Sequence, residues 1–377
     1  MSLTFKLACR NLLHDRLRFI ATVIGIVFSI VLVAIQMGLF VSFERMVTTM
    51  VDHASADLWV VPIGTKSFED PSLLDASDQH RAQAVPGVAA AVPVVSGFSQ
   101  WAVPNGGTAA IFVVGSDVSA AGLRPWNLSA GKLADLTAPD AVAIDRSYFH
   151  RLGIAGLGGS GEIRGQKAQV KVVTSGIRSF TTTPYVFTTL ERARAYTATA
   201  PDKISYLMVR LSPGADRGSV RRQLQASLRK TEVLTPAAFR QRSRDFWLYG
   251  TGAGAALFAG ALLGTIVGTV IVAQTLYSST KDHLNEFATL RAIGSSSRYI
   301  LTVIVDQALI SAVIGFSLAA CIGLAIVKLT AASALPVAMP PQLTLLLFLL
   351  TVVMCIASAV AAIAQVVRID PARVFKP

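Results

Sequence analysis

Long apolar runs alternate along this chain with segments of mixed polarity. A helix needs roughly 20 apolar residues to cross a hydrocarbon core of about 30 Å. Four runs reach that length, at residues 20–41, 249–276, 299–327 and 343–367. Asp306, in the third run, is the only charged residue in any of them. We therefore expect a membrane protein with four transmembrane helices, one early in the chain and three late.

The segments between the runs differ in their basic residues, which predicts the orientation. Lys and Arg gather in residues 1–19, 277–298 and 368–377, and short basic segments beside a membrane helix stay cytoplasmic. The short turn at residues 328–342 has no charge beyond Lys328. We expect both termini and the 277–298 loop to be cytoplasmic. Residues 42–248 then form a large periplasmic domain. The first run lacks a small-residue cleavage pattern at its end, so we interpret it as an anchor.

Residues 42–248 have the pattern of a mixed α/β domain. Apolar segments punctuated by glycines predict strands at residues 57–62, 109–115, 141–144, 169–174, 185–188, 204–211 and 232–234. Helical segments are expected at residues 146–152, 190–196 and 217–230. The order favours two α/β subdomains, the second nearer the membrane.

Composition and charge support the membrane assignment. The chain is 53% hydrophobic and 15% charged, with a net charge of +12. A basic cytoplasmic face beside anionic lipid explains part of this charge, and a lipid-facing or partner-facing outer surface explains the rest, so nucleic acid is not needed as a partner. The cysteines Cys9, Cys321 and Cys355 all lie outside residues 42–248, so we expect no disulfide in the outer domain.

No motif predicts chemistry carried out by this chain. The glycines of residues 156–161 fit GxGxxG by letters, but they follow a helical segment and precede a strand, which favours a turn. The sequence has no GxxxxGK[ST] motif, so we expect no ATP site in this chain. Its five histidines are scattered, and no serine lies in GxSxG. We expect no enzyme activity, metal or cofactor in this chain.

Two features inside the apolar runs favour helix packing or function. Gly260, Gly264 and Gly268 recur every four residues and share a helix face, which lets another helix approach closely. That seam could be with the first apolar helix or with a second copy of the chain. Asp306 is costly in a membrane, and a role in coupling and a role as a buried hydrogen-bonding group both stay open.

The 277–298 loop predicts an amphipathic helix outside the membrane. Apolar residues recur at three-residue spacing, at Leu284, Phe287, Leu290 and Ile293. Charged residues surround them, and Gly294 is placed to end the helix. Docking into a groove of a partner protein and a simple interfacial connector are the two interpretations, and we favour docking.

This loop closely resembles the coupling segment of the FtsX-like and MacB-like permeases of the type VII ABC superfamily, through residues 286–294, EFATLRAIG. Residues 8–12 with Arg16 resemble the amphipathic entry helix of that family, and residues 368–372 resemble its exit from the fourth helix. Residues 141–177 are similar to the MacB-like periplasmic core. Residues 57–61 resemble the DevC branch of glycolipid exporters.

The resemblance implies a permease subunit of an ABC exporter, in a bacterial inner membrane. Two permease copies would work with two separate ATPase subunits, which would bind ATP and Mg. ATP-driven movement would reach the outer domain by mechanotransmission and would export or extract a lipid-like, lipoprotein or hydrophobic substrate. A periplasmic membrane-fusion adaptor and an outer-membrane channel are further partners of such relatives. The coupling helix would comprise Lys281, Asp282, Leu284, Glu286, Phe287, Leu290, Arg291, Ile293 and Gly294.

Two alternatives come from other classes of protein. An FtsX-like regulator would use the outer domain to switch a periplasmic cell-wall hydrolase, although a domain of about 200 residues favours transport. A membrane sensor is less favoured, because the short tail leaves no output domain.

Overall fold

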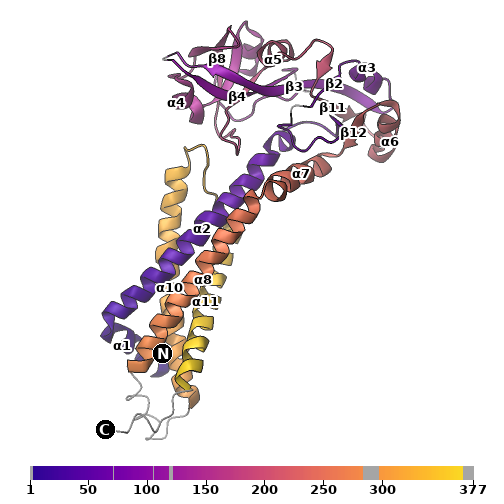
Figure 1. Ribbon diagram of the computed structural model, residues 1–377. Helices are drawn as coiled ribbons and strands as arrows, with labels where there is room; N and C mark the ends of the chain where they lie inside the picture. The colour runs from indigo at the N-terminus through magenta and orange to yellow at the C-terminus, as the bar shows by residue number, and fades with distance from the viewer. Residues whose placement is uncertain (1–2, 71, 105, 119–121, 283–296, 368–377) are drawn as a thin grey trace, which may run out of the picture. The chain divides into compact units, whose positions relative to one another are not determined.

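The computed structural model describes residues 3–70, 72–104, 106–118, 122–282 and 297–367 (Figure 1). The chain contacts divide it into two compact units. A helical unit comprises Met1–Val41, Ala255–Ala331 and Pro336–Pro377. An α/β unit comprises Ser42–Gly254 and Ala332–Leu335.

Four long helices run side by side in the helical unit, and each is long and apolar enough to cross a membrane (Figure 1). They are α2 (Arg16–Asp52), α8 (Ala253–Asp282), α10 (Ser297–Thr330) and α11 (Pro341–Val367). A shorter helix, α1 (Leu3–His14), packs against α10 and buries Ala8. The four predicted membrane helices are therefore confirmed as helices of suitable length and composition.

The start of the second predicted span was wrong. The run was expected to begin at Tyr249, but Tyr249 lies in η3 (Asp245–Gly250), a π-helical turn that precedes α8. Gly252 then adopts a φ of 76°, a left-handed conformation that glycine tolerates and that interrupts the helix. The regular apolar helix begins at Ala253.

The helices of this unit pack through small and branched side chains. Ile26 and Ile30 of α2 are buried against Val272 of α8, Ile304 of α10 and Met354 of α11. Buried hydroxyls add hydrogen bonds between helices. Ser29 Oγ donates to the Gly264 carbonyl at 2.7 Å, and Ser358 Oγ donates to the Thr269 carbonyl at 2.9 Å. Such bonds satisfy polar groups that lipid cannot satisfy.

The α/β unit is built on one large mixed sheet. Its strands follow the order β12-β1-β11-β3-β4-β9-β6-β8-β5, with β7 pairing β3 and β8. In chain order they are β1 (Leu58–Pro62), β3 (Val88–Ala102), β4 (Thr108–Ser116), β5 (Leu128–Ala130), β6 (Ala141–Asp145), β7 (Ser160–Ile163), β8 (Gln166–Thr174), β9 (Tyr185–Thr189), β11 (Tyr206–Leu211) and β12 (Thr231–Leu234). β2 (Leu74–Asp75) and β10 (Lys203–Ile204) form a separate pair.

Both faces of this sheet are covered, which β1 shows most simply. Leu58 and Val60 belong to one buried cluster, and Trp59 and Val61 belong to another. Successive strand residues point to opposite faces, so an unbroken apolar strand indicates a sheet that is buried on both sides. The covering helices are α3 (Asp78–Gln83), α5 (Leu190–Thr197), α6 (Arg217–Ser227) and α7 (Pro236–Arg244).

Two details differ from the sequence expectation. The helix expected at residues 146–152 is a 3₁₀ turn, η2 (Arg146–Tyr148), followed by α4 (Phe149–Leu152). The two expected subdomains also share a single sheet. The reason is β3, whose first half pairs with β11 and whose second half pairs with β4, so one long strand belongs to both parts. A further short 3₁₀ helix, η1 (Leu133–Thr137), precedes β6.

Candidate functional site

The predicted coupling residues fall mostly outside the described part of the chain. Lys281 is exposed in the last turn of α8, and Asp282 is the last residue of that helix. The other members lie outside the described residues: Leu284, Glu286, Phe287, Leu290, Arg291, Ile293 and Gly294. The coupling role stays a prediction.

The three glycines of α8 face α2. A Cβ atom built on Gly260 would lie 2.7 Å from Gln36 Nε2, and one on Gly264 would lie 3.1 Å from Leu32 Cδ2. A Cβ on Gly268 would overlap the Ser29 side chain. Of the two seams that the sequence left open, the structure places these glycines at the one with α2.

Asp306 lies half-buried on α10, beside the buried Gln307. Its carboxylate has no hydrogen bond or ion pair with another residue in the described ranges. Neither of its two predicted roles is decided by this placement.

The end of α2 is joined to α7 by two ion pairs within the α/β unit. Arg240 Nη1 lies 2.9 Å from Asp52 Oδ1, and Arg244 Nη1 lies 3.4 Å from Glu44 Oε1. Glu44 and Asp52 are separated by two helical turns, and the two arginines by one, so each helix presents its charges on one face. Thr48, between the acids, donates to Asp52 Oδ2 at 2.6 Å. We call these two ion pairs the stalk clamp.

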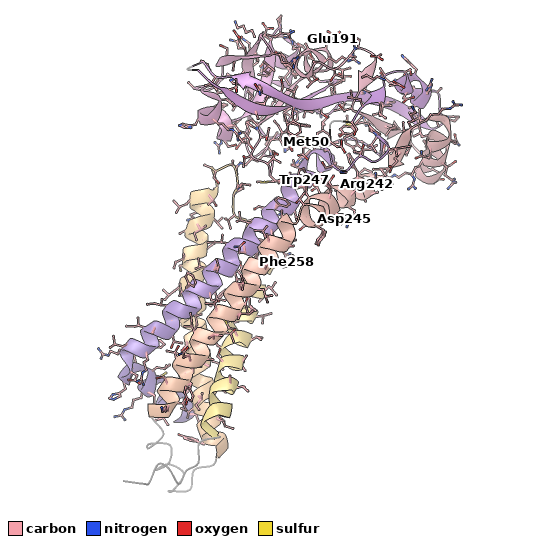
Figure 2. All side chains as sticks on the ribbon, in the orientation of Figure 1. Met50, Glu191, Arg242, Asp245, Trp247 and Phe258 are labelled. Atoms are coloured by element: carbon pink, nitrogen blue, oxygen red, sulfur yellow. The ribbon has the colours of Figure 1, made fainter. Side chains whose placement is uncertain are left out.

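A chain of aromatic rings also connects α2 to η3, the turn that follows α7. The Phe43 ring of α2 lies 4.6 Å from the Phe180 ring, and the Phe180 ring lies 4.2 Å from the Trp247 ring of η3. Edge-on and tilted pairs at these distances are favourable packing geometries. Three segments far apart in the sequence therefore meet at one aromatic contact. Trp247 is labelled in Figure 2, close to Arg242 and Asp245.

A buried carboxyl group lies near this contact. Glu69 is 6% exposed, and its Oε1 accepts a hydrogen bond of 2.5 Å from the Tyr185 hydroxyl. Burial raises the pKa of Glu69, while the Tyr185 hydroxyl lowers it by less. The nearby Trp247 indole also lowers the pKa of Glu69. Trp247 Nε1 and Glu69 Oε2 nevertheless do not form a hydrogen bond with each other, and both atoms are buried without a hydrogen-bond partner in the described structure. Burial keeps the pKa of Tyr185 well above its ordinary value, so this hydroxyl remains a donor.

The segment around Glu69 is fixed by a second tyrosine. The Tyr206 hydroxyl lies 3.0 Å from the Phe68 carbonyl and 2.8 Å from the Asp70 carbonyl. The Trp59 ring packs edge-on against the rings of Phe68, Tyr206 and Phe239. The loop after β1 is therefore held between the sheet and α7.

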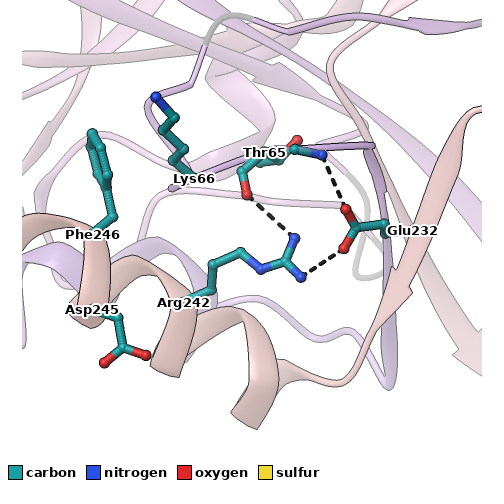
Figure 3. Close-up of a pocket in the computed structure, with 7 residues that line it drawn as sticks. Thr65, Lys66, Glu232, Arg242, Asp245 and Phe246 are labelled. Atoms are coloured by element: carbon teal, nitrogen blue, oxygen red, sulfur yellow. Dashed lines mark hydrogen bonds and ion pairs between the residues drawn. The ribbon is translucent and has the colours of Figure 1, made fainter. Parts of the chain in front are cut away.

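The same loop forms one wall of a pocket of about 450 Å³ (Figure 3). The pocket is lined by Gly64, Thr65, Lys66, Glu232, Arg242, Asp245 and Phe246. Arg242 Nη2 lies 2.6 Å from Glu232 Oε2, and the Gly64 amide donates to Glu232 Oε1 at 3.0 Å. The Arg242 guanidinium holds the pKa of the Glu232 carboxyl below its ordinary value. Lys66 Nζ lies 5.4 Å from the centre of the Phe246 ring.

Sequence reasoning missed the stalk clamp, Glu69 and this pocket. The eight-residue spacing of Glu44 and Asp52 beyond an apolar run is a visible signal for the clamp, since it places two acids on one helix face. Glu69 has no such local signal.

Two family models match the chain. The MacB-like periplasmic core domain matches residues 19–227, and the FtsX-like permease C-terminal domain matches residues 258–371. These matches agree with the family resemblance of the sequence. They also agree with the α/β domain that lies between the first and second long helices.

Similar proteins are known by sequence and by structure. Uncharacterized ABC transporter permeases of two Mycobacterium tuberculosis strains are 34% identical over 116 residues, which is 30% of this chain. The match covers 32% of those relatives, so the alignment spans about a third of their length. The crystal structure of the periplasmic region of MacB from Actinobacillus actinomycetemcomitans matches with a TM-score of 0.38 and 14% identity, over 51% of this chain and 94% of that one.

The extracellular domain of the noncanonic ABC-type transporter YknZ from Gram-positive bacteria matches with a TM-score of 0.34 and 16% identity, over 48% of this chain and 99% of that one.

The family assignment depends on the family models, of which the first alone covers more than half of the chain. The chain therefore belongs to the family of the MacB-like periplasmic core domain, and it carries this domain together with an FtsX-like permease C-terminal domain.

Proposed function

We propose that this chain is the permease subunit of an ABC exporter and that it passes movement from a separate ATPase to its own outer domain. The observation that carries this proposal is the continuity of α2. This helix has 37 residues, or roughly 55 Å at 1.5 Å per residue, against a hydrocarbon core of about 30 Å. Its last turns belong to the α/β unit, where the stalk clamp joins them to α7.

The path of movement follows from this connection. The ATPase would press on the predicted coupling helix, residues 281–293, whose first two residues are the last two of α8. The glycines of α8 allow close packing against α2, so the two helices would move together. The stalk clamp and the Phe43–Phe180–Trp247 contact would then carry the movement into the sheet. Packed elements of this kind shift as bodies because protein interiors do not deform continuously.

The partners and cargo of this proposal follow from the family. ATP and Mg would be bound by two ATPase subunits, and a second copy of this chain would complete the membrane part. The cargo would be a lipid-like, lipoprotein or other hydrophobic substrate, handled with a periplasmic adaptor and an outer-membrane channel. The predicted orientation, with both termini cytoplasmic in the inner membrane, places the 277–298 loop on the ATPase side.

Substitution of the coupling residues tests the ATPase step. Glu286→Ala and Leu290→Ala should each reduce stimulation of the copurified ATPase while membrane insertion and thermal stability stay unchanged. Lys132→Ala, at an exposed position of the outer domain, is the matched control and should leave stimulation intact. Stimulation that survives both coupling substitutions would remove this assignment. Copurification of a cell-wall hydrolase in place of an adaptor would favour the FtsX-like regulator instead of an exporter.

A further inference from the structure

One edge of the long strand β3 changes partner along its length. On the first edge, β4 pairs with residues 94–102, and the two strands lie side by side in Figure 1. On the second edge, β11 pairs with residues 88–94, and β7 pairs with Trp101 and Ala102. Residues 95–100 therefore have no strand partner on this second edge within the described ranges.

The backbone groups of Phe98 and Gln100 point toward that free edge. The Val94 carbonyl accepts a hydrogen bond from the Ser205 amide at 2.8 Å. The Ser205 hydroxyl accepts from the Ser96 amide at 2.8 Å and donates to the Ser96 carbonyl at 3.0 Å. Successive strand residues direct their N–H and C=O groups to opposite edges, so every second residue faces the same way. Phe98 and Gln100 come next in this series, and no described strand pairs with them there.

Local features end the pairing on either side of this gap. After β7, Arg164 and Gly165 adopt φ values of 51° and 74°. Two positive φ values in succession form a type I′ turn, which folds the chain back into β8 before it can pair with Gln100. On the other side, the Ser205 hydroxyl takes the place of a strand residue beside Ser96. The gap therefore spans two hydrogen-bonding positions of β3.

A groove of about 640 Å³ lies along this gap, and we call it the edge groove. Its lining includes Phe98, Ser99 and Gln100 of β3, Ala110 of β4, and Glu162 and Arg164 at the end of β7. Phe98 is 51% exposed, and its ring packs edge-on against the buried Phe112 ring at 4.9 Å. Ala110 lies opposite Gln100 on β4, and its small side chain leaves this part of the sheet open.

The edge groove also presents two charges. Glu162 lies beside Ala102 in the register of β7 and β3, and Arg164 follows where the register would reach Gln100. Both side chains are exposed, and neither forms an ion pair in the part of the chain that the structure describes. An acidic group placed opposite Gln100 would therefore be attracted by Arg164.

A free strand edge favours one kind of ligand. Its N–H and C=O groups lie in a row at the spacing of a strand, and another extended backbone matches that row. A lipid or a sugar has no such row of donors and acceptors. The edge groove is therefore complementary to an extended peptide, which would use the backbone for affinity and its side chains for specificity.

We propose that the edge groove binds an extended peptide segment of a partner protein, which adds to β3 as a short antiparallel strand. The two peptide residues opposite Phe98 and Gln100 would each exchange two backbone hydrogen bonds with β3. An apolar side chain would pack on the exposed Phe98 ring, and an acidic side chain would lie near Arg164. Because the strands are antiparallel, the acidic residue precedes the apolar residue by two positions. This binding does not depend on ATP or on the proposed export.

Synthetic peptides bound to the full-length chain in detergent test this inference. The probe is fluorescein-labelled Gly-Gly-Thr-Glu-Thr-Val-Thr-amide, and binding is followed by fluorescence anisotropy. N-methylation of its valine removes an N–H that would face β3, and this should weaken binding by about tenfold, or about 1.4 kcal/mol. N-methylation of the threonine before that valine removes an N–H that would face away, and it should weaken binding much less. The peptide with glutamate and valine exchanged should also bind more weakly.

Matched variants of the chain test the side-chain preference. Arg164→Glu should weaken binding of the probe by about tenfold and should favour a probe with lysine in place of glutamate. Arg229→Glu makes the same charge change at an exposed position after α6 and should bind the probe as the unsubstituted chain does. Arg164→Gln replaces the charge reversal if Arg164→Glu lowers thermal stability, and it should weaken binding by a smaller factor.

Three results would overturn the proposal. They are a probe affinity weaker than about 1 mM, equal binding of the two methylated peptides, and equal affinities of Arg164→Glu and Arg229→Glu. A dimer of the unsubstituted chain that excludes the probe, and that dissociates on Arg164→Glu substitution, would assign the edge groove to a second copy of the chain. That result would also overturn a partner peptide as the occupant.

Discussion

Arg240 and Asp52 are 188 positions apart in the chain, yet Arg240 Nη1 donates to Asp52 Oδ1 at 2.9 Å. Asp52 is the last residue of α2, and α7 leads through η3 to the start of α8. The contact therefore joins the last residue of α2 to α7, the helix that leads through η3 to α8. Arg244 and Glu44 form a second ion pair between α2 and α7 within the α/β unit.

The stalk clamp should contribute little to stability. Both side chains of the Arg240–Asp52 pair are more than a third exposed, and such pairs are worth about 0.5 kcal/mol. A double-mutant cycle of Arg240→Ala and Asp52→Ala, followed by denaturant unfolding, should give a coupling energy of that size. The same variants should reduce the response of the outer domain to ATP much more clearly. A full response in the double variant would show that the clamp transmits nothing.

Glu69 should make stability depend on pH. Burial raises its pKa in the folded protein above the ordinary 4.5, so the folded state holds this proton more tightly than the unfolded state. Stability from this group is present below pH 4.5 and falls as the pH rises through the raised pKa. Glu69→Gln keeps the shape of the neutral acid and should flatten this decline in thermal unfolding measured at several pH values. Glu191→Gln, at an exposed position of α5, should leave the decline unchanged.

The glycine seam of α8 should reject larger side chains. A Cβ on Gly268 would overlap Ser29, so Gly268→Leu forces α2 and α8 apart, and overpacking of this kind costs about 1–3 kcal/mol. Thermal unfolding in detergent should show the loss directly. Ala259→Leu, at an exposed position of α8, is the control and should have no effect. Equal melting temperatures for the two variants would contradict the seam with α2.

The break before α8 offers a comparison between two neighbouring glycines. Gly252 adopts a φ of 76° and has open space around its Cβ position, whereas Gly250 does not have a positive φ. Gly252→Ala should therefore destabilise the protein by roughly 1–2 kcal/mol through backbone strain alone. Gly250→Ala should be close to neutral. Unfolding of both variants under one condition would measure the difference.

The elements that were predicted correctly have a pattern of apolar and polar residues that can be recognised within each element alone. Long apolar runs with at most one charged residue predict the four long helices, because a charge inside a membrane helix is costly. Strand β1 is an unbroken apolar segment because both of its faces are buried. The start of the second span was misplaced because residues 249–252, Tyr-Gly-Thr-Gly, carry no charge and so extend the charge-free run before the helix. Nothing in that composition reveals a π-helical turn or the left-handed Gly252.

The candidate site could not be predicted because its partners are distant in the chain. Glu69 and Tyr185 are 116 positions apart and meet only when β9 joins the sheet. The pocket brings residues 64–66 beside Arg242 because β1 pairs with β12. Sequence patterns encode which face of an element is apolar, but not which elements pair. The predicted coupling loop differs from this site. Its sequence pattern is specific over a few consecutive residues, but most of those residues lie outside the described ranges.

In the proposed function, ATP hydrolysis on one side of the membrane moves α7 on the other side. Ser243 is fully buried on α7. A variant with Ser243→Cys, in which Cys9, Cys321 and Cys355 are replaced by serine, therefore carries a single thiol on the buried face of α7. Its labelling by a membrane-impermeant maleimide would be timed in the reconstituted complex with and without ATP. Ser227→Cys, exposed on α6, should label at a rate that ATP does not change.

ATP should raise the labelling rate at Ser243→Cys several-fold, and Leu290→Ala should abolish this increase. A rate that stays constant while the ATPase is active would contradict mechanotransmission through this chain.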